Sequence, residues 1–226
     1  MEYTWQFEPV WQSLDLLIGG LAVTAQLTLY SVLFGILVAI LVAGARTSRS
    51  RILRGVSRVY IELFRGLPLL VLLVWLYYCL PLVTESALHL SPFWIGVLGL
   101  ALNFSALEAE ILRSGYEAIP RGEIDVARTF NFSPLQTARY IIIPQALWRS
   151  LPPTLGQVIN TVKFSALVSF ISVPELFYVN QALVQDTFRP LEFYSVLAVL
   201  YLLLIIPASV CVQILEAQLN RRFRGG

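Results

Sequence analysis

The sequence predicts an all-α integral membrane protein with five transmembrane helices in one domain spanning residues 1–226. Of its residues, 57% are hydrophobic and only 13% are charged, whereas ordinary soluble domains carry about 25% charged residues. Five mostly apolar stretches are each long enough to cross about 30 Å of hydrocarbon as a helix. They are also much longer than the roughly ten alternating residues of a barrel strand, which favours helices.

The expected spans cover about residues 14–45, 60–83, 90–112, 152–174 and 192–216. The N-terminus reads MEYTWQFEP and has no Lys or Arg, so we expect the first stretch to be a retained span and not a cleaved signal peptide. In the second span, Gly66 and Pro68 could break the helix and free backbone groups to line a site. Only Lys163 interrupts the fourth.

Basic residues gather on one side of these spans. Thirteen of the sixteen Lys and Arg residues lie in the first inter-span loop, the connection between spans 3 and 4, and the C-terminal tail. The opposite side has only Arg189, so we expect the N-terminus outside and the C-terminus in the cytoplasm. The group from Arg46 to Arg58 is expected to meet anionic lipid headgroups. A net charge of +2 is too small for a nucleic-acid partner.

The connection between spans 3 and 4, residues 116–150, is too long to be an unstructured loop. Pro120 and Gly122 mark a turn before a short expected helix, 123–130. Ser133 is then an N-cap with proline following it at the first helical position. Two short helices joined at Asn131 would form a docking element for a cytoplasmic partner, or alternatively a loop packed against lipid headgroups.

A family pattern runs through this connection. The stretch 118–153, AIPRGEIDVARTFNFSPLQTARYIIIPQALWRSLPP, resembles the EAA region of ABC-importer permeases, and most closely that of the polar-amino-acid uptake family, the histidine, glutamine, arginine and glutamate permeases. Upstream, 62–70 is similar to the family's ELFRGTPLL, and 109–115 to its AEIxRxG. Downstream, Lys163, Leu167 and Ser169 fit its KxTSLxS. Asn131 replaces the family's glycine, and Asn tolerates a left-handed backbone.

The resemblance implies a type I ABC-importer permease fold in a bacterial inner membrane, with a cytoplasmic coupling helix between spans 3 and 4. It implies uptake of a polar amino acid with a solute-binding protein, a pair of ATPase subunits, and a second permease copy, identical or a sister. ATP and Mg would be bound by the ATPase, with no cofactor in this chain, which also lacks a GK[ST] phosphate loop. The residues expected to couple to the ATPase are Gly122, Glu123, Asp125, Ala127, Arg128, Asn131 and Ser133.

Charged residues inside a span cost about 2.5–3.5 kcal/mol at the helix centre, so each needs a reason. Lys163 lies near mid-depth of span 4 and shares one polar stripe with Gln157 and Asn160. We expect Lys163 to meet the substrate carboxylate or a partner acid in the path, or else to form an internal ion pair that holds the helices together.

Span 3 carries Asn103 and Glu110, which are about 20° apart around the helix, whereas Glu108 points away from Glu110. Glu110 could receive an ammonium group, or it could pair with Arg113 at the cytoplasmic interface. Arg65 could pair with Glu62 one turn away. The expected substrate-binding set is Lys163, Glu110, Asn103, Asn160, Ser165, Arg65, Gly66 and Leu67. Leu67 and Ser165 differ from the family pattern, so they do not identify the amino acid.

Two other functions stay open at this point. One is a membrane enzyme that modifies lipids with Glu108, Glu110 and the arginines, and the other is a channel subunit that works without ATP. No Ser-His-Asp or Cys-His arrangement is evident, so no catalytic residue is expected. The single histidine, His89, has no nearby ligand partner, so no metal site is expected.

Overall fold

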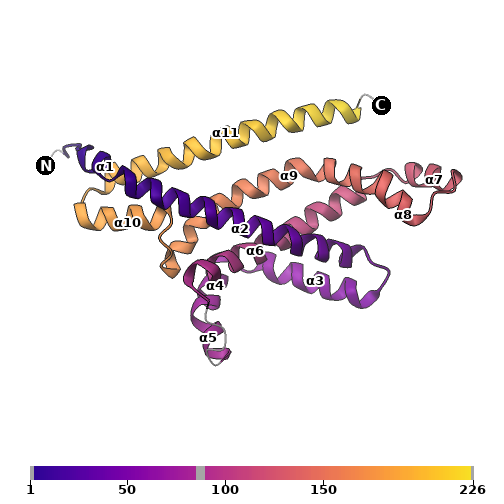
Figure 1. Ribbon diagram of the computed structural model, residues 1–226, viewed down its shortest axis with the longest axis horizontal. Helices are drawn as coiled ribbons and strands as arrows, with labels where there is room; N and C mark the ends of the chain where they lie inside the picture. Colours follow the sequence, from indigo (N-terminus) through magenta and orange to yellow (C-terminus); the bar gives the residue numbers. More distant parts are fainter. Residues whose placement is uncertain (1–2, 85–89, 225–226) are drawn as a thin grey trace.

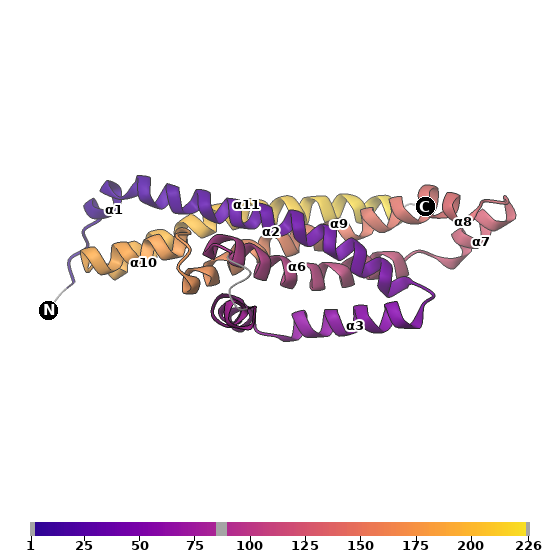
Figure 2. The ribbon, with the colours of Figure 1, turned by 60° about the horizontal axis from the view of Figure 1, so that its bottom comes forward.

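The protein is an elongated bundle of helices, as the computed structural model shows for residues 3–84 and 90–224 (Figures 1 and 2). His89 lies outside these residues. Helices alone make up the regular structure in the described part of the chain, which confirms the all-α class. The connection formed by residues 116–150 and the end of helix α11 (Pro190–Arg224) lie at one end of the bundle, and the N-terminal helix α1 (Glu8–Gln12) lies at the other (Figure 1).

Four helical segments among the described residues are long and apolar enough to cross a membrane, or up to five if one bent pair counts as a span. The four are α2 (Leu14–Thr47), α6 (Pro92–Glu117), the run Pro134–Ile171 and the segment Pro190–Leu219 of α11 (Pro190–Arg224). The run Pro134–Ile171 contains α9 (Ile143–Phe164), which begins nine residues before the expected start of the fourth span at 152. The pair Pro152 and Pro153 therefore lies inside a helix and does not mark its start.

The expected second span, 60–83, is not one helix. Helix α3 (Arg51–Gly66) is followed, after a break, by α4 (Leu69–Val74), the π-helical turn η1 (Trp75–Cys79) and α5 (Leu80–Val83), with a bend of 101°. The residue before a proline is pushed out of the helical region, and Leu67 is extended with ψ 133°. Pro68 then starts the new direction, so the expected break at this position is present.

Helix α6 is the centre of the bundle and packs against α2, α3 and α9. Of the most apolar stretch of 18 residues in α6, 67% is buried, against 6% for the matching stretch of α11, which lies along one edge of the bundle (Figure 1). Two further helices were not expected from the apolar runs: α1 (Glu8–Gln12) and α10 (Leu176–Thr187). Glu175 caps α10 by accepting hydrogen bonds from the amides of Phe177 and Tyr178.

Candidate functional site

A cavity of about 550 Å³ lies where the end of α3 meets α6 and α9. Helix α6 contributes side chains that recur every three to four residues, and α9 contributes three that are spaced by four, so each helix turns one face to the cavity. Two residues of the expected substrate-binding set are brought together here, Arg65 and Glu110. The complete lining is Arg65, Leu107, Glu110, Ile111, Ser114, Gly115, Ala118, Arg149, Pro153 and Gln157.

Glu110 is the acidic group of this cavity, and two arginines hold it. Its Oε2 lies 2.7 Å from Nη2 of Arg113, and its Oε1 lies 3.8 Å from Nε of Arg46. Arg113 also pairs with Glu117 at 2.5 Å. Of the two alternatives for Glu110, this structure therefore shows the pairing with Arg113. Part of the Glu110 side chain, 23%, stays exposed, so its carboxylate still contributes to the cavity wall.

Asn103 has a different position from the one expected for a substrate contact. Its Nδ2 donates to the carbonyl of Phe64 at 3.1 Å, and its side chain is buried. In a continuous helix that carbonyl would accept from residue 68, but Pro68 has no N–H group. Asn103 supplies the missing donor from α6, so it positions the break between α3 and α4 and does not line the cavity.

Replacing Asn103 by Leu is therefore expected to lower the free energy of unfolding by about 1–3 kcal/mol, because the Phe64 carbonyl loses its donor. Thermal unfolding of the purified protein measures this change. Asn160→Leu is the matched control, since Asn160 is an exposed asparagine on α9. Equal midpoints for the two variants would contradict the positioning role of Asn103.

The remaining residues of the expected binding set do not line this cavity. Lys163 and Asn160 are exposed on α9, and Lys163 forms no ion pair with any described residue of this chain, so the internal-pair alternative is not present here. Ser165 is fully buried, and its hydroxyl donates to the carbonyl of Val162 at 2.8 Å. Gly66 and Leu67 form the break itself and are exposed.

The structure also differs from the expectations for the Glu62–Arg65 pair and for Arg149. Glu62 and Arg65 are both exposed, and no ion pair joins them among the described residues, so the expected pairing is wrong. Arg149 was not expected to line the cavity. Its spacing of four and eight residues from Pro153 and Gln157 is the signal that could have identified it. In the described residues, no group of three His, Cys, Asp or Glu residues could hold a metal ion.

The connection formed by residues 116–150 contains two short helices, as expected. Helix α7 (Arg121–Thr129) is followed two residues later by Asn131, which has a left-handed backbone with φ 56°. The amide of Asn131 donates to the Arg128 carbonyl and that of Phe132 to the Ala127 carbonyl, each at 3.0 Å. These two bonds form a Schellman motif, which usually needs glycine at the left-handed residue and tolerates asparagine.

Ser133 then begins helix α8 (Pro134–Thr137) with a complete capping box. Its Oγ accepts from the Gln136 amide at 3.2 Å, and Oε1 of Gln136 accepts from the Ser133 amide at 2.8 Å. A hydrogen bond from Gln145 to Glu123 connects α7 to α9. The tip formed by residues 121–137 is therefore an ordered structure that is joined to a membrane helix.

The tip lies at one end of the bundle (Figure 1) and exposes apolar side chains. Val126 is 55% exposed, Phe130 73% and Leu135 78%, and Tyr140, just beyond the tip, is 64% exposed. Among the residues expected to couple, Ala127 alone is buried, and Gly122, Asp125, Arg128, Asn131 and Ser133 are exposed. Asp125 pairs with Arg128 at 3.1 Å on this surface. Exposed apolar patches next to charged groups are typical of protein–protein contacts.

Comparison with known proteins finds one matching family and three similar proteins. Residues 31–225 match the family described as binding-protein-dependent transport system inner membrane component. The chain is 32% identical over 220 residues to the glutamine transport system permease protein GlnP of Escherichia coli (strain K12), covering 97% of this chain and 99% of that protein. It is 34% identical over 206 residues to the octopine transport system permease protein OccM of Rhizobium radiobacter, covering 88% and 84%. A crystal structure of an amino acid ABC transporter with histidines superposes with a TM-score of 0.88 at 32% identity, covering 96% of this chain and 100% of that one.

Proposed function

Because the chain belongs to the binding-protein-dependent transport system inner membrane component family, we propose that it is the permease subunit through which a polar amino acid crosses the membrane. The chain is a multi-pass inner-membrane protein and a transport subunit, and ATP hydrolysis takes place in separate ATPase subunits. It has the type I ABC-importer permease fold. The proposed substrate class, a polar amino acid, rests on the match to GlnP along 97% of the chain.

We infer five spans, with the bent pair α3 and α4–α5 as the second, and an N-terminus outside the cell. Two observations support this orientation. The tip and the end of α11 lie at one end of the bundle and the N-terminus at the other (Figure 1). Thirteen of sixteen basic residues belong to the loops and tail that would lie on the side of the tip, as the positive-inside rule requires.

The tip would be the coupling element. Its exposed apolar residues Val126, Phe130 and Leu135 are suited to a groove on an ATPase subunit, and the capped ends of α7 and α8 keep them in place. Because Gln145 joins α7 to α9, a displacement of the tip would move the helix that carries Gln157 and Lys163. Such coupling requires that the ATPase contact the tip differently in its two states.

The cavity beside Arg65 and Glu110 would be the cytoplasmic part of the transport path, closed on its open side by a second permease copy, the same chain or a sister. Lys163 and Asn160 would line the path further along α9, where no described residue of this chain neutralises the lysine. An ammonium group aimed into the path would attract the carboxylate that every amino acid carries. A solute-binding protein would deliver the substrate on the outer side.

Reconstitution tests this proposal. Vesicles containing the chain, its ATPase and candidate binding proteins are expected to accumulate one labelled amino acid from a panel, only with ATP and binding protein present.

Lys163→Met is expected to lower uptake about 10- to 100-fold by removing a charge-assisted hydrogen bond, while Lys163→Arg retains more activity. Flux without ATP would instead indicate a channel, and equal uptake by Lys163→Met and wild type would remove Lys163 from the path.

A further inference from the structure

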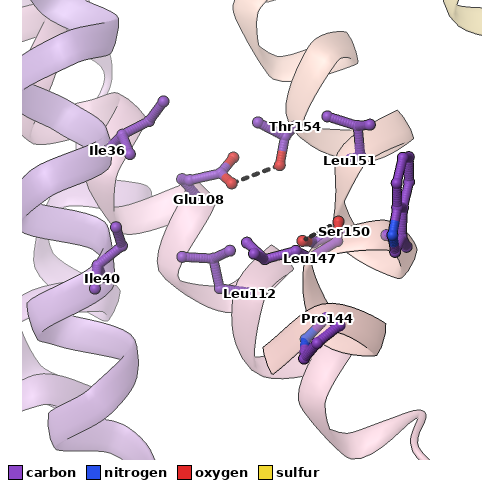
Figure 3. Close-up of a pocket in the computed structure, with 10 residues that line it drawn as sticks. Ile36, Ile40, Glu108, Leu112, Pro144, Leu147, Ser150, Leu151 and Thr154 are labelled. Atoms are coloured by element: carbon purple, nitrogen blue, oxygen red, sulfur yellow. Dashed lines mark hydrogen bonds between the residues drawn. The ribbon is translucent and has the colours of Figure 1, made fainter. Parts of the chain in front are cut away.

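A buried carboxyl group lies in a second pocket, on the side of α6 away from Glu110. Glu108 is 2% exposed, and its Oε1 accepts a hydrogen bond from Thr154 Oγ1 on α9 at 2.5 Å (Figure 3). Its Oε2 is also buried, and it has no hydrogen-bond partner among the described residues. Burying a polar atom without a partner is costly, and it is more so for a carboxylate within a membrane. The free oxygen therefore indicates a partner that comes from outside the chain.

The pocket around Glu108 has a volume of about 470 Å³, within the range of ligand sites. Its walls are apolar, from Ile36 and Ile40 on α2 to Leu112 on α6 and Leu151 on α9 (Figure 3). None of the described residues that line it is Lys, Arg or His. The Ser150 hydroxyl donates to a carbonyl of its own helix at 3.2 Å. The chain therefore offers Glu108 a large apolar space and no positive charge.

The pocket opens on an apolar surface of the membrane-spanning helices α2 and α9. Ile40 is 54% exposed, Leu147 57% and Trp148 46%, and all three line the pocket. Glu108 lies nine residues before the end of α6, about 14 Å along the helix. An apolar rim of this kind on membrane-spanning helices is suited to a molecule that carries a hydrocarbon chain.

We propose that this pocket binds a long-chain membrane amphiphile through its primary amine. The ammonium group donates to the free Oε2 of Glu108, and the hydrocarbon chain packs between α2 and α9. A protonated amine supplies both the missing donor and the missing positive charge, and charge-assisted hydrogen bonds are about twice as strong as neutral ones. A neutral alcohol with the same chain supplies only the donor. The pocket shares no lining residue with the cavity beside Glu110, and the proposal does not depend on which solute is transported.

Trp148 provides the readout, because its indole lines the pocket and bromine atoms quench indole fluorescence on contact. The complete importer complex is placed in phosphatidylcholine nanodiscs and titrated with a long-chain alkylamine that carries bromine on its chain. The matched alcohol serves as the uncharged ligand. The difference between wild type and Trp148→Phe isolates the signal of this residue. We expect saturable quenching by the amine at a concentration at least about tenfold lower than by the alcohol.

Glu108→Gln is expected to abolish the preference for the amine, and Glu117→Gln, an exposed glutamate on the same helix, is expected to keep it. Leu151→Trp fills the pocket and should prevent quenching by both ligands; it also serves as a second test if Glu108→Gln does not fold. Competition by phosphatidylethanolamine would identify a phospholipid as the source of the amine, and its absence a single-chain amine. Equal quenching by amine and alcohol, an unchanged preference in Glu108→Gln, or no quenching of Trp148 would overturn the proposal.

Discussion

Replacing Gly122 by Trp is expected to lower ATP-dependent uptake at least about 30-fold while the chain stays folded in the membrane. Gly122 is the second residue of α7 and is exposed, and a Cβ at this position would meet no atom of the chain within 4 Å. A side chain at this position therefore starts into open space, and the indole is expected to meet whatever docks on the tip. A clash at the centre of a protein contact costs about 2 kcal/mol or more, which corresponds to the stated loss. Uptake and co-purification of the ATPase measure it.

Gly55→Trp is the matched control, because Gly55 on α3 also has no atom within 4 Å of its Cβ position and does not belong to the tip. Ala127 is a poorer choice, although it belongs to the same expected coupling set. It is 2% exposed, so a bulky side chain there would disturb α7 itself. Normal uptake and ATPase binding in Gly122→Trp would show that the tip does not contact the ATPase.

The tip is the part of the structure that sequence reasoning predicted best, because its signals are local. Ser133 and Pro134 indicate a helix start by their own backbone preferences, and the capping box confirms it. Asn131 indicates a left-handed residue in the same way, and its φ of 56° confirms that expectation. These features depend on residues within about six positions of each other, so no knowledge of tertiary contacts is needed.

The binding set was harder to predict, because helical spacing shows which residues share a face and not what that face meets. Asn103 and Glu110 do lie on similar faces of α6. Asn103, however, donates a hydrogen bond to the carbonyl of Phe64, 39 residues away along the chain. This hydrogen bond forms because Pro68 has no N–H group to donate to that carbonyl and because α3 packs on α6. Ser165 was expected to line the path, but its hydroxyl bonds to its own helix instead. Helix α10 was missed because it lies between two long apolar runs.

The cavity itself arises from three helices that are distant in sequence. Arg65, Glu110 and Gln157 come from α3, α6 and α9, and only the folded bundle places them around one space. Composition predicts that such polar groups avoid lipid, but several interior arrangements satisfy that condition equally well. The way α6 crosses α9 determines which of these arrangements forms. That crossing depends on a glycine where the two helices meet.

Replacing that glycine, Gly115, by Leu is expected to destroy the packing of α6 on α9. A Cβ at position 115 would lie 2.8 Å from the Ala146 carbonyl oxygen and 3.3 Å from the Ser150 Cβ. The nearest atom belongs to the backbone and cannot rotate away, so the two helices must separate. Overpacking in a core usually costs about 1–3 kcal/mol, and a contact with backbone places Leu at or above the upper end of that range. The yield of folded protein and its unfolding midpoint measure the effect.

Gly44→Leu separates this clash from the general effect of adding a leucine to a membrane helix. Gly44 lies near the end of α2, and its Cβ position has no atom within 4 Å. Gly115→Ala places only the Cβ in the crossing, so we expect a folded protein whose α9 is displaced. Because α9 joins the tip to the cavity, this variant should lower uptake per ATP hydrolysed and keep ATPase binding. If Gly115→Leu folded as well as Gly44→Leu, the close crossing of α6 and α9, and with it the link between tip and cavity, would be wrong.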